Sequence, residues 1–314
     1  MTQLEPLLIS VVVPTYNRER YLKDTLDSIL SQSYPHVECI VMDAGSTDGT
    51  LDLLRSYGER IQWRSGPDSG AAEAINKGWA LSKGSVLAWL NADDCWAPGA
   101  AQFVADYMQQ NPQTDVLYGA CGIIDAAGSL VDEYPPERWD LRRAVLTCDH
   151  LINQAAAFMR REALESVGWL TEAWCHDHDL WLRLAQAGKR FDRVERRLAD
   201  ARIWPDNLGN QASVVIPAKL ALTRRFFDSP ALSPEQRGWQ QRAWSGAYLR
   251  CIDYLRPLQA ELWRMAWRSL SADSANAPRV AFRLVRRIVE CTPPLYALHS
   301  AVRRRFFPQR RART

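Results

Sequence analysis

The chain has 314 residues, 47% hydrophobic and 24% charged, which is ample material for a globular core. It has no run of 18 uninterrupted apolar residues of the kind that forms a transmembrane helix. The N-terminus shows neither the basic region nor the cleavage site of a signal peptide. The seven cysteines are scattered without a CxxC pair, as in reduced cytosolic proteins. We therefore expect a cytoplasmic protein.

The overall charge of +3 is unevenly distributed along the chain. From Val214 onward there are 19 Lys and Arg against 6 Asp and Glu, a net +13, which leaves −10 for the preceding part. An acidic part suits a metal site, and a basic part suits an anionic surface such as phospholipid. The composition therefore predicts two domains, residues 1–212 and a helical, basic region over residues 213–314.

Strand-like and helix-like segments alternate over the first 95 residues. Strands are expected over residues 8–13, 39–42, 61–64 and 86–90, and helices over residues 18–32, 51–57 and 70–82. Thr50 is placed to cap the second helix, and Gly84 is placed to end the third. This alternation predicts an α/β fold with a mostly parallel sheet flanked by helices. Ligands of such sheets bind beyond the carboxyl ends of the strands.

The pattern changes in the second half of the chain. A hairpin is expected where residues 123–125 and 130–132 flank an Ala-Ala-Gly-Ser turn. A strand over residues 155–159 precedes two helices, over residues 161–167 and 177–187. From Val214 the chain reads as short helices separated by prolines.

Asp43 ends the second expected strand and opens the turn Gly45-Ser46-Thr47-Asp48-Gly49. A turn aspartate commonly satisfies nearby backbone N–H groups. At the carboxyl end of a parallel strand, the same carboxylate can accept from a nucleobase N–H. The residues alone leave both roles open.

Asp93 and Asp94 follow the fourth expected strand. Two adjacent carboxylates at a strand end repel each other unless a positive charge lies nearby. Magnesium and manganese prefer such oxygen ligands and share them with substrate phosphates. The alternative is a solvated loop or helix cap, and the position at a strand end favours the metal.

Asp177 and Asp179 lie in the segment Cys175-His176-Asp177-His178-Asp179. No second ligand pair stands at a recognisable spacing elsewhere, which disfavours a zinc site. One carboxylate is expected to cap the helix that begins here. The other is then available as a general base.

Five separated blocks resemble, in order and spacing, the inverting glycosyltransferases of family 2, which have the GT-A fold. They are VVVPTYNRERYLKDTLDSILSQSYPHVECIVMDAGSTDGT, SGPDSGAAEAINKG, LAWLNADD, NQAAAFMRREALESVGWL and HDHDLWLRLAQAG. The resemblance covers residues 8–210. It implies that residues 1–212 form a nucleotide-sugar transferase domain, with the helical region as an extension.

The resemblance also implies roles for matching positions. The nucleotide sugar would contact Pro14, Thr15, Tyr16, Asp43, Asp68, Asn76, Lys77 and Asp93. Asp94 would bind Mg²⁺ or Mn²⁺ directly, with Asp93 facing the ribose or the metal. Asp177 would be the catalytic base. The chain departs from the family where His176 replaces an acidic residue and where Trp204 replaces a histidine near the diphosphate.

The implied activity is metal-dependent, inverting transfer of a single sugar from a UDP- or dTDP-sugar to the hydroxyl of a glycan or lipid-linked acceptor. Cell-surface polysaccharide biosynthesis is the expected setting. The alternative is a nucleotide-sugar or glycan-binding protein that has lost activity. A nucleotidyltransferase or dehydrogenase would need a glycine-rich loop after the first strand, which PTYNRER lacks. A processive synthase would need transmembrane helices and a Gln-x-x-Arg-Trp motif, which residues 240–244 do not match.

The end of the chain, from Arg303 to Arg313, combines dense positive charge with Phe306 and Phe307. Basic segments with interleaved aromatic residues can lie on anionic membrane surfaces. The alternative is a solvated tail. The tryptophans of the helical region before it recur at helical spacing, and such residues are often core residues. No nucleic-acid-binding motif is present, and we expect no nucleic acid to bind. We expect peripheral contact with the inner membrane face through this tail.

Overall fold

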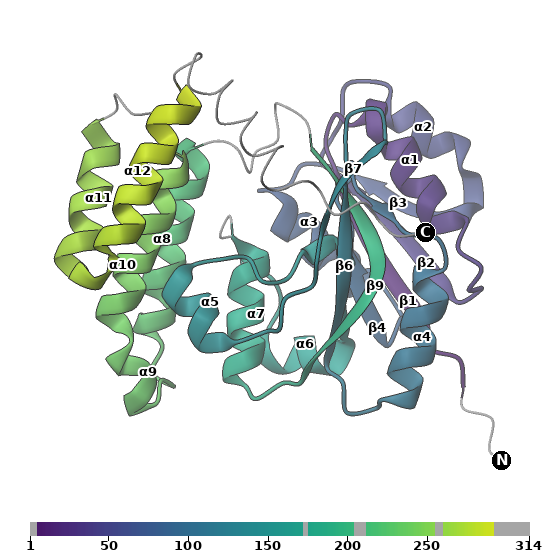
Figure 1. Ribbon diagram of the computed structural model, residues 1–314. Helices are drawn as coiled ribbons and strands as arrows, with labels where there is room; N and C mark the ends of the chain where they lie inside the picture. The colour runs from purple at the N-terminus through teal and green to yellow at the C-terminus, as the bar shows by residue number, and fades with distance from the viewer. Residues whose placement is uncertain (1–4, 172–174, 204–211, 255–259, 292–314) are drawn as a thin grey trace. The chain divides into compact units, whose positions relative to one another are not determined.

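The computed structural model describes residues 5–171, 175–203, 212–254 and 260–291 (Figure 1). The chain divides into two compact units. The first comprises Met1–Leu141 and His150–Asn207, and the second Arg142–Asp149 and Leu208–Thr314. The second unit therefore includes a short segment, Arg142–Asp149, that lies in the sequence between the two parts of the first unit.

The first unit contains a nine-stranded sheet of order β3-β2-β1-β4-β8-β6-β9-β5, with β7 paired to β6. The strands are β1 Ile9–Thr15, β2 Val37–Asp43, β3 Gln62–Ser65, β4 Val86–Trp89, β5 Cys95–Trp96, β6 Val116–Ile124, β7 Leu130–Tyr134, β8 Ala157–Arg160 and β9 Phe191–Arg202. β5, β7 and β8 run opposite to the other six strands. The predicted α/β fold with a mostly parallel sheet is confirmed.

Helices cover both faces of this sheet, as Figure 1 shows. They are α1 Glu19–Leu30, α2 Thr50–Ser56, α3 Ala71–Leu81, α4 Ala100–Gln110, α6 Arg161–Val167 and α7 His176–Gln186. Because side chains alternate along a strand, Val11 and Val13 of β1 join the core beneath α1, α2 and α4. Val12 joins the opposite core, with Trp79 of α3 and Trp181 of α7.

Thr50 and Gly84, which the sequence pattern placed at helix boundaries, have other roles in the structure. Thr50 does not cap α2 but begins it, and its Oγ1 accepts from the backbone N–H of Arg18 at 3.0 Å. α3 ends at Leu81, before Gly84. Gly84 is instead required for close packing, since a Cβ there would lie 2.3 Å from Oγ of Ser10. Thr50 therefore contacts the segment after β1, and Gly84 packs against β1 itself.

The second unit is helical. Its helices are α5 Leu141–Thr147, α8 Ala212–Asp228, α9 Pro234–Gly238, α10 Gln240–Cys251, α11 Ala260–Ala272 and α12 Ala277–Cys291. Ser245 of α10 exchanges hydrogen bonds with Ser269 of α11 and accepts from the amide of Asn276 at 2.7 Å. Across the described helices, none is long and apolar enough to cross a membrane.

Candidate active site

The polar residues predicted to form the site follow the carboxyl ends of adjacent parallel strands. The strand register places Thr15 of β1 beside Asp43 of β2, and Asp43 beside Ser65 of β3. β4 runs parallel to β1 on its other side and leads directly into Asn91-Ala92-Asp93-Asp94. The candidate ligand-binding and metal-binding side chains therefore share one edge of the sheet.

Asp43 is buried and accepts several hydrogen bonds from its own turn. Oδ2 accepts from the backbone N–H groups of Gly45 and Ser46, each at 3.0 Å, and from Oγ of Ser65 at 2.6 Å. Oδ1 accepts from Oγ of Ser46. The carboxylate thus has the structural turn role that the sequence left open. This role also fixes Asp43 at the wall of a pocket.

The pocket has a volume of about 440 Å³. Its polar lining comes from Asp43, Arg64, Ser65, Asp68 and Lys77, and Met42, Pro67 and Leu81 are among its apolar residues. Three of the predicted nucleotide-sugar residues, Asp43, Asp68 and Lys77, are therefore brought together here. The mixture of acceptors, cations and apolar walls suits a ligand with a flat polar ring and an anionic part.

The loop before α3 shapes one side of this pocket. Oδ1 of Asp68 accepts from the backbone N–H of Gly70 at 2.9 Å. Glu73 binds both Ser69 and, at 2.7 Å, the ammonium of Lys77. These contacts hold Lys77 along α3 at the pocket wall.

The other predicted nucleotide-sugar residues lie in different environments. Thr15 is buried and Pro14 is half-buried, whereas the ring of Tyr16 is exposed. Asn76 uses its side chain on the protein backbone: its amide donates to the carbonyl of Leu170 at 2.8 Å and accepts from the N–H of Leu170 at 3.0 Å. This geometry gives Asn76 a structural function, fastening α3 to the segment after α6.

Asp94 is a buried carboxylate held by two donors. Oδ1 accepts from the backbone N–H of Arg202 at 2.9 Å, and Oδ2 from the amide of Asn91 at 3.1 Å. Burial and the neighbouring carboxylate of Asp93 raise the pKa of Asp94 to about 7, against the opposing effect of these hydrogen bonds and the Arg202 charge. The carboxyl group of Asp94 is therefore partly protonated near neutral pH, and a further positive charge nearby would favour its ionised form.

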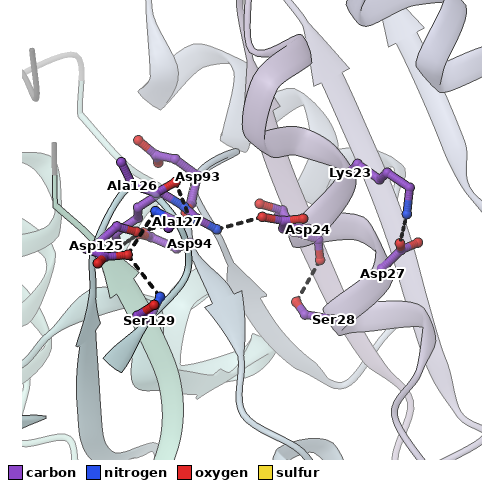
Figure 2. A network of polar contacts seen from close by, with 12 residues as sticks. Lys23, Asp24, Asp27, Ser28, Asp93, Asp94, Asp125, Ala126, Ala127 and Ser129 are labelled. Atoms are coloured by element: carbon purple, nitrogen blue, oxygen red, sulfur yellow. Dashed lines mark hydrogen bonds and ion pairs between the residues drawn. The ribbon is translucent and has the colours of Figure 1, made fainter. Parts of the chain in front are cut away.

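Arg202, the last residue of β9, connects the segments around this acidic pair. Its Nε donates to the carbonyl of Asp93 at 2.9 Å, and a second nitrogen donates to the carbonyl of Asp125 at 3.2 Å. A third nitrogen lies 2.9 Å from Oδ2 of Asp24 on α1. The guanidinium also stacks over the ring of Tyr21, 4.7 Å from its centroid. Figure 2 shows Asp93, Asp94 and Asp125 close together, with Asp24 of α1 opposite them.

The acidic pair fits a hard divalent cation. The donor atoms are carboxylate oxygens, and the raised pKa of Asp94 shows that added positive charge would be favourable there. Over the described ranges, no three His, Cys, Asp or Glu side chains are grouped so as to hold a metal by themselves. Asp93 and Asp94 would therefore supply part of a coordination shell, leaving positions for phosphate oxygens and water.

Asp177 lies in the first turn of α7 and faces His150. Its Oδ2 is 3.6 Å from Nδ1 of His150. Burial alone would raise the pKa of Asp177, but His150, with His176 and His178 nearby, outweighs this effect and holds the pKa well below the usual range. The carboxylate is thus ionised throughout the neutral range.

Asp179 has a different environment from Asp177. It is buried, accepts from Nε of Arg183 at 2.9 Å and from Oγ1 of Thr171 at 3.1 Å. Arg183 in turn donates to the carbonyls of Val167, Gly168 and Trp169. Asp179 therefore belongs to an ion-paired network that holds the end of α6, which leaves Asp177 as the carboxylate suited to chemistry.

A family model described as Glycosyl transferase family 2 matches residues 10–168, about half of the chain. The chain belongs to glycosyl transferase family 2. The match contains the pocket residues and the acidic pair, while Asp177 and Arg202 follow it. The resemblance drawn from the five sequence blocks is confirmed.

Among curated relatives, proteins from Rickettsia species named as uncharacterized glycosyltransferases are 27–30% identical. The aligned parts cover 29–65% of those relatives' lengths. Bacillus subtilis (strain 168) TuaG, named for teichuronic acid biosynthesis, is 40% identical over 115 residues, covering 35% of this chain and 45% of TuaG.

Solved structures of similar fold belong to GT-A transferases. The mannosyltransferase PcManGT of Pyrobaculum calidifontis, solved with GDP-Man and Mn²⁺, has a TM-score of 0.58 and 20% identity, covering 96% of this chain and 88% of its own. The 1–349 fragment of S. aureus TarS, solved with UDP-GlcNAc, has a TM-score of 0.56 and 16% identity, covering 85% and 89%. At these identities the likeness establishes the GT-A fold.

Three residues that contact the candidate site residues were not singled out from sequence. They are Arg202, Asp24 and His150. Trp204, the residue that the resemblance placed near the diphosphate, lies outside the described residues. The sequence signal for Arg202 is its position at the end of a strand-like segment; its proximity to Asp93 and Asp94 is visible only in the fold.

Proposed function

We propose that this chain transfers a single sugar from a nucleotide diphosphate sugar to an acceptor hydroxyl, with inversion at the anomeric carbon and dependence on Mg²⁺ or Mn²⁺. The observation that carries the proposal is the buried Asp94 beside Asp93 at the edge of the sheet where the pocket also lies. Two adjacent carboxylates repel each other unless a cation lies nearby. A cation held by such a pair is what metal-assisted departure of a diphosphate requires.

The donor is proposed to be a UDP- or dTDP-sugar. TarS, with a similar fold, was solved with UDP-GlcNAc, which supports a uridine-type donor, whereas PcManGT was solved with GDP-Man. In the proposed complex the base and ribose occupy the pocket beside Asp43 and Asp68. Lys77 provides a cation at the same wall, next to the region where the diphosphate would run.

The division of labour among the residues follows from their contacts. Asp93 and Asp94 would hold the cation, which would supply positive charge beside the departing diphosphate. Arg202 keeps this pair in place through the carbonyl of Asp93 and the carboxylate of Asp94. Asp177 and the residues beside it assist removal of the acceptor proton. Inversion follows when the acceptor attacks in line with the departing group, without a covalent intermediate.

The acceptor is proposed to be a glycan or lipid-linked glycan of the cell surface. TuaG, 40% identical over its aligned part, is named for teichuronic acid biosynthesis, which supports a polysaccharide setting. The acceptor hydroxyl would lie beside His150 and Asp177, because one of these two neighbouring side chains would accept its proton.

Peripheral contact with a membrane is part of the same proposal. The basic tail from Arg303 to Arg313 lies outside the described residues. Within the second unit, α11 buries Leu262 and Met265 but leaves Trp263 and Trp267 53% and 72% exposed. Arg264 and Arg268 follow these tryptophans and are also exposed. A helix face of this composition favours the headgroup region of anionic bilayers.

Calorimetric titration of nucleotide sugars, with and without Mn²⁺, tests the proposed function directly. A screen of UDP-, dTDP- and GDP-sugars should find one donor whose binding depends on the metal. Incubation of that donor with glycan acceptors, followed by NMR of the product, should show an inverted anomeric linkage. Metal-dependent binding without hydrolysis or transfer would favour the alternative, a nucleotide-sugar-binding protein that has lost activity.

A further inference from the structure

Strand β7, Leu130–Tyr134, forms an exposed edge of the sheet in the first unit. Among the described strands it pairs with β6 alone, so its outer backbone edge has no partner strand there (Figure 1). All five residues are exposed, and the apolar side chains of Leu130, Val131 and Tyr134 are 52%, 41% and 40% exposed. Exposed apolar side chains that are rimmed by polar groups mark binding surfaces.

One end of β7 is tied to the acidic pair. The turn that leads into the strand accepts hydrogen bonds from the Arg202 guanidinium, through the carbonyls of Asp125 at 3.2 Å and Ala126 at 3.4 Å. The same guanidinium donates to the carbonyl of Asp93 at 2.9 Å. The turn that begins β7 therefore lies beside the segment that carries the proposed metal ligands.

The other end of β7 is tied to the segment beside Asp177. The hydroxyl of Tyr134, the last residue of the strand, donates to the backbone carbonyl of His150 at 3.3 Å. Nδ1 of His150 lies 3.6 Å from Oδ2 of Asp177. The strand therefore passes, over about 14 Å of extended chain, from one part of the candidate active site to the other.

The strand carries two carboxylates among its apolar residues. Asp132 and Glu133 are consecutive and exposed. The register against β6 shifts between Ile123 and Ile124, which leaves Val131 as the extra residue of a β-bulge, a feature common beside active sites. Carboxylates on an edge strand oppose pairing with a second copy, because like charges would be brought together. This edge is therefore better suited to a ligand than to another strand.

We propose that β7 is the platform on which the acceptor glycan lies, and that this glycan is neutral. The inference rests on the proposed function and assigns its acceptor to a surface. The ring of Tyr134 covers the apolar face of a sugar, with Leu130 and Val131 beside it. Asp132 and Glu133 accept hydrogen bonds from sugar hydroxyls, and their charge repels uronic acids and other anionic sugars.

Titration of oligosaccharides, followed by saturation-transfer NMR, tests this platform. The probes are neutral tri- to pentasaccharides of hexose or N-acetylhexosamine, and a matched set in which uronic acids replace the hexoses. Wild type should bind the neutral set in preference to the uronic set. Tyr134→Ser should weaken binding of the neutral probes by about tenfold. Tyr134→Phe loses only the hydroxyl bonded to His150 and should stay close to wild type.

Removal of the two carboxylates should change the two probe sets in opposite directions. Asp132→Asn/Glu133→Gln should weaken binding of the neutral probes, because carboxylates accept stronger hydrogen bonds than amides. The same variant should bind the uronic probes more tightly than wild type does. Asp52→Asn/Glu59→Gln removes two exposed carboxylates of α2 and the short helix after it, and this matched control should leave both affinities unchanged.

The outcomes separate this proposal from the proposed function. Neutral-probe affinity that is unchanged in both Tyr134→Ser and the double amide variant would place the glycan elsewhere. Equal or tighter binding of the uronic probes by wild type would overturn the neutral class, and no binding of any probe would overturn the platform. A wild-type dimer that Tyr134→Ser dissociates would identify a second copy as the occupant. Absence of metal-dependent donor binding by wild type would instead overturn the proposed function, whatever the glycan result.

Discussion

The backbone N–H of Arg202 donates to Oδ1 of Asp94 at 2.9 Å, across a sequence separation of 108 residues. The same residue uses its side chain on the carbonyl of Asp93 and on Asp24. The end of β9 is thereby joined to the segment after β4 and to α1. The segment that carries the acidic pair is thus held in position by the protein, which would reduce the ordering cost of the proposed metal binding.

Replacement of Asp94 should abolish metal-dependent donor binding. Asp94→Ala removes the buried carboxylate, so we expect loss of transfer and loss of the Mn²⁺-dependent part of the donor affinity. Titration of the donor with and without Mn²⁺ measures this. Asp52→Ala, at an exposed carboxylate of α2, is the matched control and should behave as wild type. Donor affinity and turnover equal to wild type in Asp94→Ala would show that the metal assignment is wrong.

Arg202→Met should weaken metal binding without removing a metal ligand. Loss of the guanidinium leaves the carbonyls of Asp93 and Asp125 without their donor, so the segment after β4 should become less ordered. We expect a fall of about 10–100-fold in Mn²⁺ affinity, the range for residues that orient metal ligands. Asp24→Asn, which keeps the arginine, should have a smaller effect. Thermal unfolding should be followed in parallel, and a variant that loses stability but keeps its metal affinity would contradict the orienting role.

The affinity for Mn²⁺ should depend on pH through Asp94. Its pKa is raised to about 7, so in the metal-free protein this carboxyl group is mostly protonated below that pH. Because a cation and a proton compete for the same oxygen, the apparent affinity should be nearly constant above pH 7 and fall by up to about tenfold per pH unit below it. Titrations between pH 5.5 and 7.5 measure this slope. A flat profile in wild type would show that Asp94 does not exchange its proton for the metal.

The sequence indicated the acidic pair and three of the pocket residues, Asp43, Asp68 and Lys77, because the relevant patterns are local. A carboxylate pair after a buried strand, or a loop before a helix, can be recognised within a few residues. The contacts of Arg202, His150 and Gly84 cannot, since each depends on segments brought together by the register of the sheet. Gly84 illustrates this: its lack of a side chain is needed for Ser10, 74 residues earlier, whose Oγ accepts from the Gly84 N–H.

Asn76 provides a prediction in which sequence resemblance and geometry differ. The resemblance assigns it to donor binding, but its amide binds both backbone groups of Leu170. Asn76→Ala should therefore destabilise the protein by about 1–3 kcal/mol, because it leaves backbone groups without partners. Chemical denaturation measures this loss. At a temperature where the variant is folded, donor affinity should be close to that of wild type, and a selective loss of donor affinity at unchanged stability would restore the ligand-binding role.

The last prediction concerns membrane contact. Replacing Trp263 and Trp267 with serine removes the two exposed apolar side chains of α11 while keeping Arg264 and Arg268. If this face and the basic tail both contact lipid, wild type should sediment with anionic vesicles but not with neutral ones, and high salt should release it. The double serine variant and a chain truncated after Ser300 should each bind less, the first through lost apolar insertion and the second through lost charge. Each exposed arginine near the headgroups contributes about 1 kcal/mol, so removal of the tail should have the larger effect at low salt. Equal sedimentation of all three proteins would show that neither segment contacts the bilayer.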